Sequence, residues 1–139
     1  HNLGFLFMVN NFTQQFARIL KKYSKAETTD LNQLIKIQLG VSPSQAGSFL
    51  ASNWGLPETI GSVMSHYDQA DYAEADWPLI CTVGLAIDCV AALNRDQDQP
   101  SSLGHADRLS IDPAKLAELW PQFRQLQSQT KELASALFN

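Results

Sequence analysis

The stretch from Gly40 to Tyr67 reads GVSPSQAGSFLASNWGLPETIGSVMSHY, and it contains start and stop signals for two consecutive helices. Ser42 is a typical N-cap residue, and Pro43 follows at the first helical position, where its missing N–H costs nothing. Gln45 stands three residues after Ser42, which is the spacing of a capping box. The first helix is therefore predicted to begin at Pro43.

This helix is predicted to end near Trp54, because Gly55 supplies the left-handed residue that commonly follows a helix. Leu56-Pro57 then forces extended backbone, since the residue before a proline disfavours the helical region. A second helix ends near His66 and carries three apolar residues on one face: Ile60, Val63 and Met64. We expect Trp54 to be a buried anchor at the joint, because a large aromatic side chain there has to pack somewhere.

Helical periodicity continues on both sides of this stretch. Residues 3–9 indicate the end of one helix, residues 12–23 an amphipathic helix, and residues 31–39 a third, capped by Thr29 or Asp30. No alternating strand pattern and no internal repeat appears. The sequence therefore predicts an all-α fold, a bundle of about six or seven helices.

The longest apolar helix is predicted at residues 77–94, WPLICTVGLAIDCVAALN, with Asp76 as its N-cap. Its nearly continuous hydrophobicity predicts burial on most sides, and Asp88, its only charge, is expected on one wet or partner-facing strip. Cys81 and Cys89 are separated by about 12 Å along a helix axis, which excludes a disulfide between them. Reduced thiols packed in the core of a cytoplasmic protein are expected.

The last third of the chain begins with a polar segment, residues 95–110, whose Pro100 and Gly104 predict a mobile connection. We expect three parts: residues 1–94 as the core of a helical domain, this connection, and a C-terminal helical segment, residues 111–139. The C-terminal segment is expected to dock on the same domain.

Asp112-Pro113 restarts the helix in that segment, and Pro121 is expected to kink or briefly break it. One apolar stripe runs along it at spacings of three and four, with Thr130 in its one gap. The stripe consists of Leu116, Leu119, Trp120, Phe123, Leu126, Leu133 and Leu137. Its outer end, residues 134–138, is expected to be the part that would bind in trans.

The composition of the 139 residues, 45% hydrophobic and 17% charged, is typical of a single soluble globular domain. A formal net charge of -4 argues against a protein that coats nucleic acid, since such proteins need a basic face. The longest apolar run, residues 3–9, is far short of the ~20 residues of a membrane span. Three cations, Arg18, Lys22 and Lys25, are interpreted as a solvated helix face rather than a phosphate-binding strip.

The stretch quoted first resembles the second half of the HD-related output domain (HDOD) of bacterial signalling proteins. His1-Asn2-Leu3-Gly4 is similar to the family's His-Asp-Ile-Gly segment, and it precedes the other matches in the family's order. Those matches are Gly40, Gly47, Trp54, Leu56, Pro57 and His66. The resemblance extends over about the first two thirds of the chain. It implies an HD-like bundle whose N-terminal half lies before His1, since the chain starts with neither an initiator Met nor a signal sequence.

The wider HD superfamily consists of phosphohydrolases in which His and Asp side chains hold a divalent ion that activates water. The resemblance places Asn2 where that family has Asp, Pro43 where it often has His, and Tyr67 where it has the second His of a pair. Only His1 and His66 remain, and His66 is interpreted as a helix-end residue. We therefore expect no bound metal, no cofactor and no catalytic residue, while the binding residues stay open.

Other kinds of chemistry are not indicated by the sequence. Cys81 and Cys89 have no positioned His, and no glycine-rich phosphate loop is present. Trp54 and Trp77 are interpreted as core anchors, and His105 as a residue of the mobile connection without a role.

The leading hypothesis is a non-catalytic regulatory or output module of bacterial signal transduction. It would be cytoplasmic, would contact a protein partner or a fused signalling domain, and would use neither nucleic acid nor a membrane. One alternative is a metal-dependent phosphohydrolase of nucleotides or cyclic dinucleotides, with its ligands before His1. The other is a helical oligomerisation domain that forms a homo-oligomer through the C-terminal stripe, Leu116 to Leu137.

Overall fold

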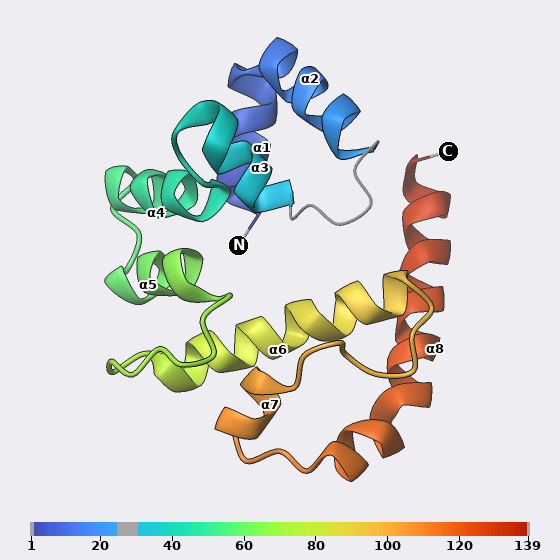
Figure 1. Ribbon diagram of the computed structural model, residues 1–139. Helices are drawn as coiled ribbons and strands as arrows, with labels where there is room; N and C mark the ends of the chain where they lie inside the picture. Colours follow the sequence, from blue (N-terminus) through green and yellow to red (C-terminus); the bar gives the residue numbers. More distant parts are fainter. Residues whose placement is uncertain (1, 25–30, 139) are drawn as a thin grey trace. The chain divides into compact units, whose positions relative to one another are not determined.

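The computed structural model describes residues 2–24 and 31–138, and these form eight α-helices and no strand (Figure 1). The predicted all-α class is confirmed. The chain divides into two compact units, His1–Tyr67 and Asp68–Asn139. The predicted boundaries at residues 94 and 110 do not coincide with this division and stay predictions.

The first unit contains five helices. They are α1 (Leu3–Asn11), α2 (Thr13–Tyr23), α3 (Leu31–Leu39), α4 (Pro43–Asn53) and α5 (Glu58–His66). Four fully buried side chains from the first three helices form its centre: Met8, Phe16, Ile19 and Ile35. Phe5 packs edge-on against Phe16, with ring centroids 5.2 Å apart. The predicted caps Thr29 and Asp30 lie outside the described residues.

The predicted start of α4 is confirmed in detail. The Ser42 hydroxyl accepts a hydrogen bond from the Gln45 amide at 3.2 Å, and the Gln45 side chain accepts one from the Ser42 amide at 3.0 Å. Both amides belong to the group that a helix start leaves without intrahelical partners. The capping box therefore satisfies two donors at the point where α4 enters the unit.

Replacing Ser42 with alanine removes one of these bonds and is expected to lower the free energy of unfolding by ~1 kcal/mol. Urea denaturation followed by circular dichroism measures the change. Ser52→Ala, at an exposed position of the same helix, serves as the control and should stay within ~0.5 kcal/mol of wild type. Equal midpoints for the two variants would contradict a stabilising role for the cap.

The prediction that Trp54 is a buried anchor at the end of α4 is wrong, because this residue is 60% exposed. Gly55 has the predicted left-handed backbone, with φ of +66°. The Leu56 amide donates to the Ala51 carbonyl at 2.9 Å, and the Gly55 amide donates to the Ser52 carbonyl at 3.1 Å. These two bonds form a Schellman motif, which closes the helix through backbone alone. The turn does not depend on an aromatic anchor, so Trp54 is left on the surface.

Gly4 and Gly47 mark the place where α1 and α4 cross at backbone contact. A Cβ atom added to Gly4 would lie closer than 3.0 Å to the Pro43 carbonyl oxygen and to the Gly47 amide nitrogen. A Cβ on Gly47 would lie 2.9 Å from the terminal methyl group of Met64, on α5. Only glycine at position 4 lets α1 and α4 approach this closely, whereas a methyl group at position 47 would displace the flexible end of Met64 and lie 3.3 Å from the Gly4 amide nitrogen.

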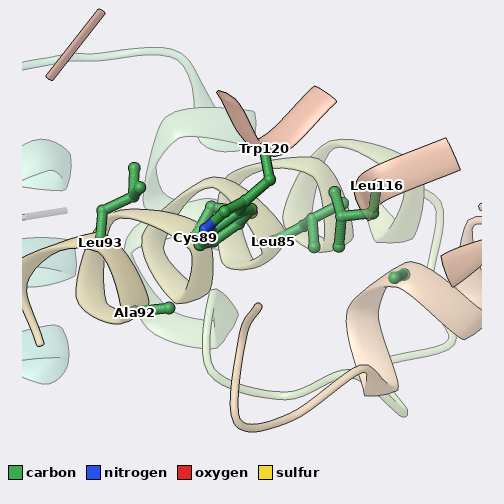
Figure 2. Close-up of a cluster of buried hydrophobic side chains, with 7 residues drawn as sticks. Leu85, Cys89, Ala92, Leu93, Leu116 and Trp120 are labelled. Atoms are coloured by element: carbon green, nitrogen blue, oxygen red, sulfur yellow. The ribbon is translucent and has the colours of Figure 1, made fainter. Parts of the chain in front are cut away.

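The second unit contains α6 (Trp77–Asn94), α7 (Gly104–Arg108) and α8 (Pro113–Phe138). Its core joins one face of α6 to α7 and to the first turns of α8 (Figure 2). The buried members are Leu85, Cys89, Ala92, Leu93, Ala106, Leu116 and Trp120. Trp120 also packs edge-on against Phe123, with ring centroids 5.9 Å apart.

Three expectations for this unit need correction. α6 has the predicted bounds, but it is not buried on most sides, since Leu79 and Val90 are 43% and 57% exposed. The predicted connection contains a helix, α7, because Ala106 contributes to the core. α8 runs without a break through the exposed Pro121, so the break expected there as one of two outcomes does not occur, and the kink stays a prediction.

Candidate functional site

The positions that the family resemblance aligns with metal ligands lie near one end of the first unit. Asn2 immediately precedes α1, whose Gly4 contacts the Pro43 carbonyl at the start of α4. α4 and α5 are joined by a short turn and pack side by side, so the end of α5 returns toward the start of α4 (Figure 1). His66 and Tyr67 stand at that end, while His1 lies outside the described residues.

Three of the four described side chains at these positions differ from the carboxylate and imidazole ligands of a divalent ion. Asn2 is an exposed neutral amide, Pro43 is a buried hydrocarbon ring, and Tyr67 is a half-buried phenol. Within residues 2–24 and 31–138, no three His, Cys, Asp or Glu side chains converge in a way that could hold a metal ion. Of the four described positions, His66 is the one that carries an imidazole.

A comparison with protein-family models matches residues 1–70 to the HDOD domain. The chain belongs to the HDOD family. The match ends three residues after the first compact unit, so the HDOD part of this chain corresponds to helices α1–α5. The family resemblance was expected to extend over about the first two thirds of the chain, which is longer than the matched residues 1–70. Searches of curated proteins and of solved structures returned no match.

Outside the HDOD match, the structure corrects the predictions for His105 and Asp88. His105 is only 6% exposed, and its Nδ1 lies 2.7 Å from the Asp88 carboxylate. The expected wet or partner-facing charge of α6 is therefore paired with α7 of the same unit. Asp88 is the one charged residue of a long apolar helix, and a half-buried charge requires a partner, so the sequence did contain a signal for this pair.

The other nitrogen of His105, Nε2, is buried and has no hydrogen-bond partner among the described residues. The imidazole thus uses one of its two polar atoms to join α7 to α6. A second contact between these helices involves Trp77, whose half-buried ring lies 4.9 Å below the Arg108 guanidinium. Trp77 is therefore a packing residue with a cation–π partner.

Cys81 and Cys89 are free and buried, in agreement with the prediction. Burial raises the pKa of the Cys81 thiol, and burial together with the Asp88 charge raises the pKa of the Cys89 thiol. The thiolate is the nucleophilic form, so a raised pKa lowers reactivity at neutral pH. Neither thiol is suited to nucleophilic catalysis.

We expect both native thiols to react with a disulfide reagent at least about tenfold more slowly than the same thiols in denaturant at the same neutral pH. The rate should rise with pH, because the raised pKa values delay formation of the thiolate. Absorbance of the released thiolate gives the rate. Ser128→Cys, an exposed position on α8, is the matched control and should react rapidly. Full-rate reaction of the two native thiols would disprove their burial.

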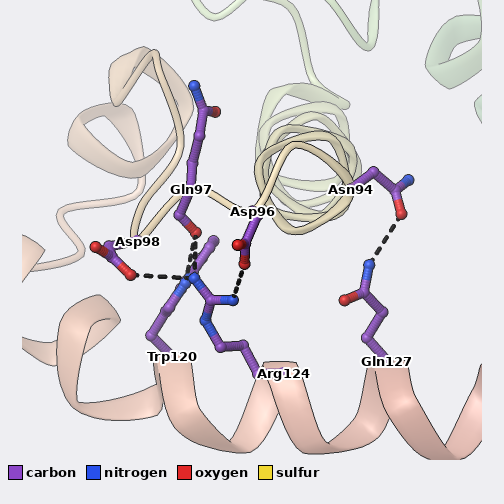
Figure 3. A network of polar contacts seen from close by, with 7 residues as sticks. All are labelled: Asn94, Asp96, Gln97, Asp98, Trp120, Arg124 and Gln127. Atoms are coloured by element: carbon purple, nitrogen blue, oxygen red, sulfur yellow. Dashed lines mark hydrogen bonds and ion pairs between the residues drawn. The ribbon is translucent and has the colours of Figure 1, made fainter.

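A polar network attaches α8 to the loop after α6 (Figure 3). Arg124 donates to the carboxylates of Asp96 and Asp98 and to the Gln97 carbonyl, and that carbonyl also accepts from Trp120 Nε1 at 3.0 Å. The Arg124 hydrogen bond holds the pKa of Asp96 below its usual range. Gln127 bonds the Asn94 side chain at 2.9 Å. These bonds hold the middle of α8 against the C-terminal end of α6 and the loop that follows it.

An apolar groove of about 590 Å³ lies between α6 and α8 on the second unit. Most of its lining residues are aliphatic or aromatic, and its polar members are Thr82, Asn94, Gln127, Thr130 and Lys131. The lining includes Ala86, Val90, Leu93, Phe123, Leu126 and Lys131. Its size falls within the range of ligand-binding pockets, and its chemistry suits an apolar occupant.

α6 is also, among the described helices, the one long and apolar enough to cross a membrane, with a mean hydropathy of 1.6. Length and composition alone are weak evidence, because the core helix of a soluble protein passes the same test. In this structure 39% of its residues are buried.

Arg18 and Lys22 on α2 are exposed, in keeping with a solvated face, and Lys25 lies outside the described residues.

Proposed function

We propose that this chain is a non-catalytic regulatory or output module of signal transduction that acts by contacting other proteins. Its membership of the HDOD family supports a signalling role. The observation that carries the non-catalytic part is the set of side chains at the family's ligand positions: Asn2, Pro43 and Tyr67. An amide, a hydrocarbon ring and a phenol do not replace carboxylate and imidazole ligands of a catalytic divalent ion.

We also propose a cytoplasmic location and a protein partner rather than nucleic acid or a membrane. The formal net charge of -4 disfavours contact with phosphates. The apolar surface of α6 is used within the second unit, where α7 and α8 cover part of it and where Asp88 pairs with His105. These features support a soluble domain whose remaining apolar surface is available to proteins.

Elemental analysis of the dialysed protein tests the proposal, together with an assay for hydrolysis of a generic phosphodiester. We expect neither a stoichiometric divalent metal nor hydrolysis above that of buffer. His66→Ala is the informative variant, because His66 is the described imidazole at the family's ligand positions. One equivalent of iron, manganese or zinc that is lost in this variant would refute the proposal and favour a metal-dependent phosphohydrolase.

A further inference from the structure

The apolar stripe of α8 continues beyond the part of the helix that α6 covers. Leu116 and Trp120 are buried in the core of the second unit, whereas Leu126, Leu133 and Leu137 are 57%, 62% and 71% exposed. Gln127 bonds Asn94, the last residue of α6, and residues 128–138 continue past it (Figure 1). This outer part of α8 forms a straight apolar edge without a covering helix in its own unit.

The exposed stripe has the spacing of a coiled-coil seam. Steps of four and three residues alternate along the whole of it, which is the repeat that lets two helices pack side by side. The seam residues are Leu119, Phe123, Leu126, Thr130, Leu133 and Leu137. The positions that flank the seam beyond Trp120 are Gln122, Gln127, Gln129, Ala134 and Ala136. Because these carry no charge, two identical copies can approach along the seam without repulsion between like charges.

The groove between α6 and α8 lies against the first half of the same seam. Phe123, Leu126 and Thr130 belong both to the groove and to the seam. Within the described part of the second unit, an apolar helix end that no other helix covers therefore lies next to an apolar groove. Each is the complement of the other, which is the requirement for an interface related by two-fold symmetry.

We propose that two copies of this chain associate through antiparallel α8 helices centred on Ser128, each inserting residues 130–137 into the groove of the other. In this register Phe123 faces Leu133 of the second copy, and Leu126 faces Thr130 of the second copy. Leu119 and Leu137 meet at the two ends. One contact thus covers both grooves and both outer helix ends, and it closes as a dimer.

Other occupants account for less of this surface. A small apolar molecule would fill the groove but leave Leu133 and Leu137 in water. A parallel pair of α8 helices would cover the leucines but place each outer end beside its own copy, so neither groove would be filled. The surface belongs to α6 and α8, which lie outside the HDOD match, so this inference is independent of the proposed signalling function.

The test is light scattering with sedimentation equilibrium of the full 139-residue chain and of two variants. We expect a concentration-dependent dimer for the wild type. Leu133→Glu should weaken it at least about a hundredfold, because two symmetry-related carboxylates would be buried without partners. Unchanged circular dichroism should show that this exposed position does not affect folding. The control is Ile37→Glu on α3, where the replaced residue is 68% exposed, and it should dimerise like wild type.

A monomeric wild type at millimolar concentration, or equal dimerisation of wild type and Leu133→Glu, would overturn the inference. Cross-linking through introduced cysteines tests the orientation. Gln129→Cys lies next to the proposed two-fold axis and should form a disulfide-linked dimer on mild oxidation. Ala136→Cys should not, since two such residues would be ~24 Å apart along antiparallel axes. In a parallel pair both positions would stand level with their symmetry mates, so equal cross-linking of Gln129→Cys and Ala136→Cys would indicate the parallel pair and would overturn the proposal.

Discussion

Replacing Gly4 with alanine is expected to unfold the first unit, which is the largest effect that this structure implies for a single methyl group. The added Cβ would meet the Pro43 carbonyl oxygen and the Gly47 amide nitrogen, and both belong to the backbone of α4. No rotamer change relieves such a clash. Overpacking in a core typically costs ~1–3 kcal/mol, and a backbone clash at a helix crossing should reach or exceed that upper limit.

Urea denaturation and amide exchange of residues 2–24 and 31–67 measure the effect. Gly61→Ala, in the middle of α5, is the matched control, because a Cβ there would contact only the Ser48 hydroxyl at 3.7 Å. The control should be more stable than wild type by ~0.5–1 kcal/mol, as expected for glycine replaced by alanine inside a helix. If Gly4→Ala retained wild-type exchange protection, the close crossing of α1 and α4 would be wrong.

The second large effect is expected for Trp120→Ala, with a loss of ~3–5 kcal/mol in the free energy of unfolding. Trp120 is 5% exposed, packs between α6 and Phe123, and donates to the Gln97 carbonyl. Its removal would therefore leave a cavity and also remove one of the hydrogen bonds that attach α8 to the loop after α6. The midpoint of urea denaturation, with intrinsic fluorescence as a second signal, measures the loss.

Trp54→Ala provides the comparison, since it removes the same side chain from a surface position. We expect its free energy of unfolding to stay within ~0.5 kcal/mol of that of wild type. The two variants together decide which tryptophan is a structural anchor. A larger loss for Trp54→Ala than for Trp120→Ala would reverse the assignment made from the structure.

The features predicted correctly depend on a few neighbouring residues. The capping box of Ser42 and Gln45 and the left-handed Gly55 are determined by local backbone chemistry, so sequence spacing was sufficient to find them. The bounds of α6 followed from its composition in the same way. The ligand positions at Asn2, Pro43 and Tyr67 came from the family resemblance, and the structure places them near one end of the HDOD unit.

The features that sequence reasoning missed depend on contacts between distant segments. Trp54 was expected to be buried because of its size, but backbone hydrogen bonds of the Schellman motif end the helix without it, and its side chain is exposed. His105 was assigned to a mobile connection because its neighbours are polar, although Asp88, 17 residues earlier, holds it in the core. Periodicity identified the stripe on α8, but it did not indicate that coverage by α6 stops near Gln127.

The contact between Gly4 and Gly47 has a consequence for how this domain tolerates substitution. It is made of backbone atoms, so it does not depend on the side chains at Asn2 and Tyr67, and Pro43 takes part only through its backbone carbonyl. A lineage is therefore free to exchange the ligand residues while the two glycines preserve the helix crossing. In this domain, substitutions at the positions aligned with ligands and retention of the helix crossing are therefore independent of one another.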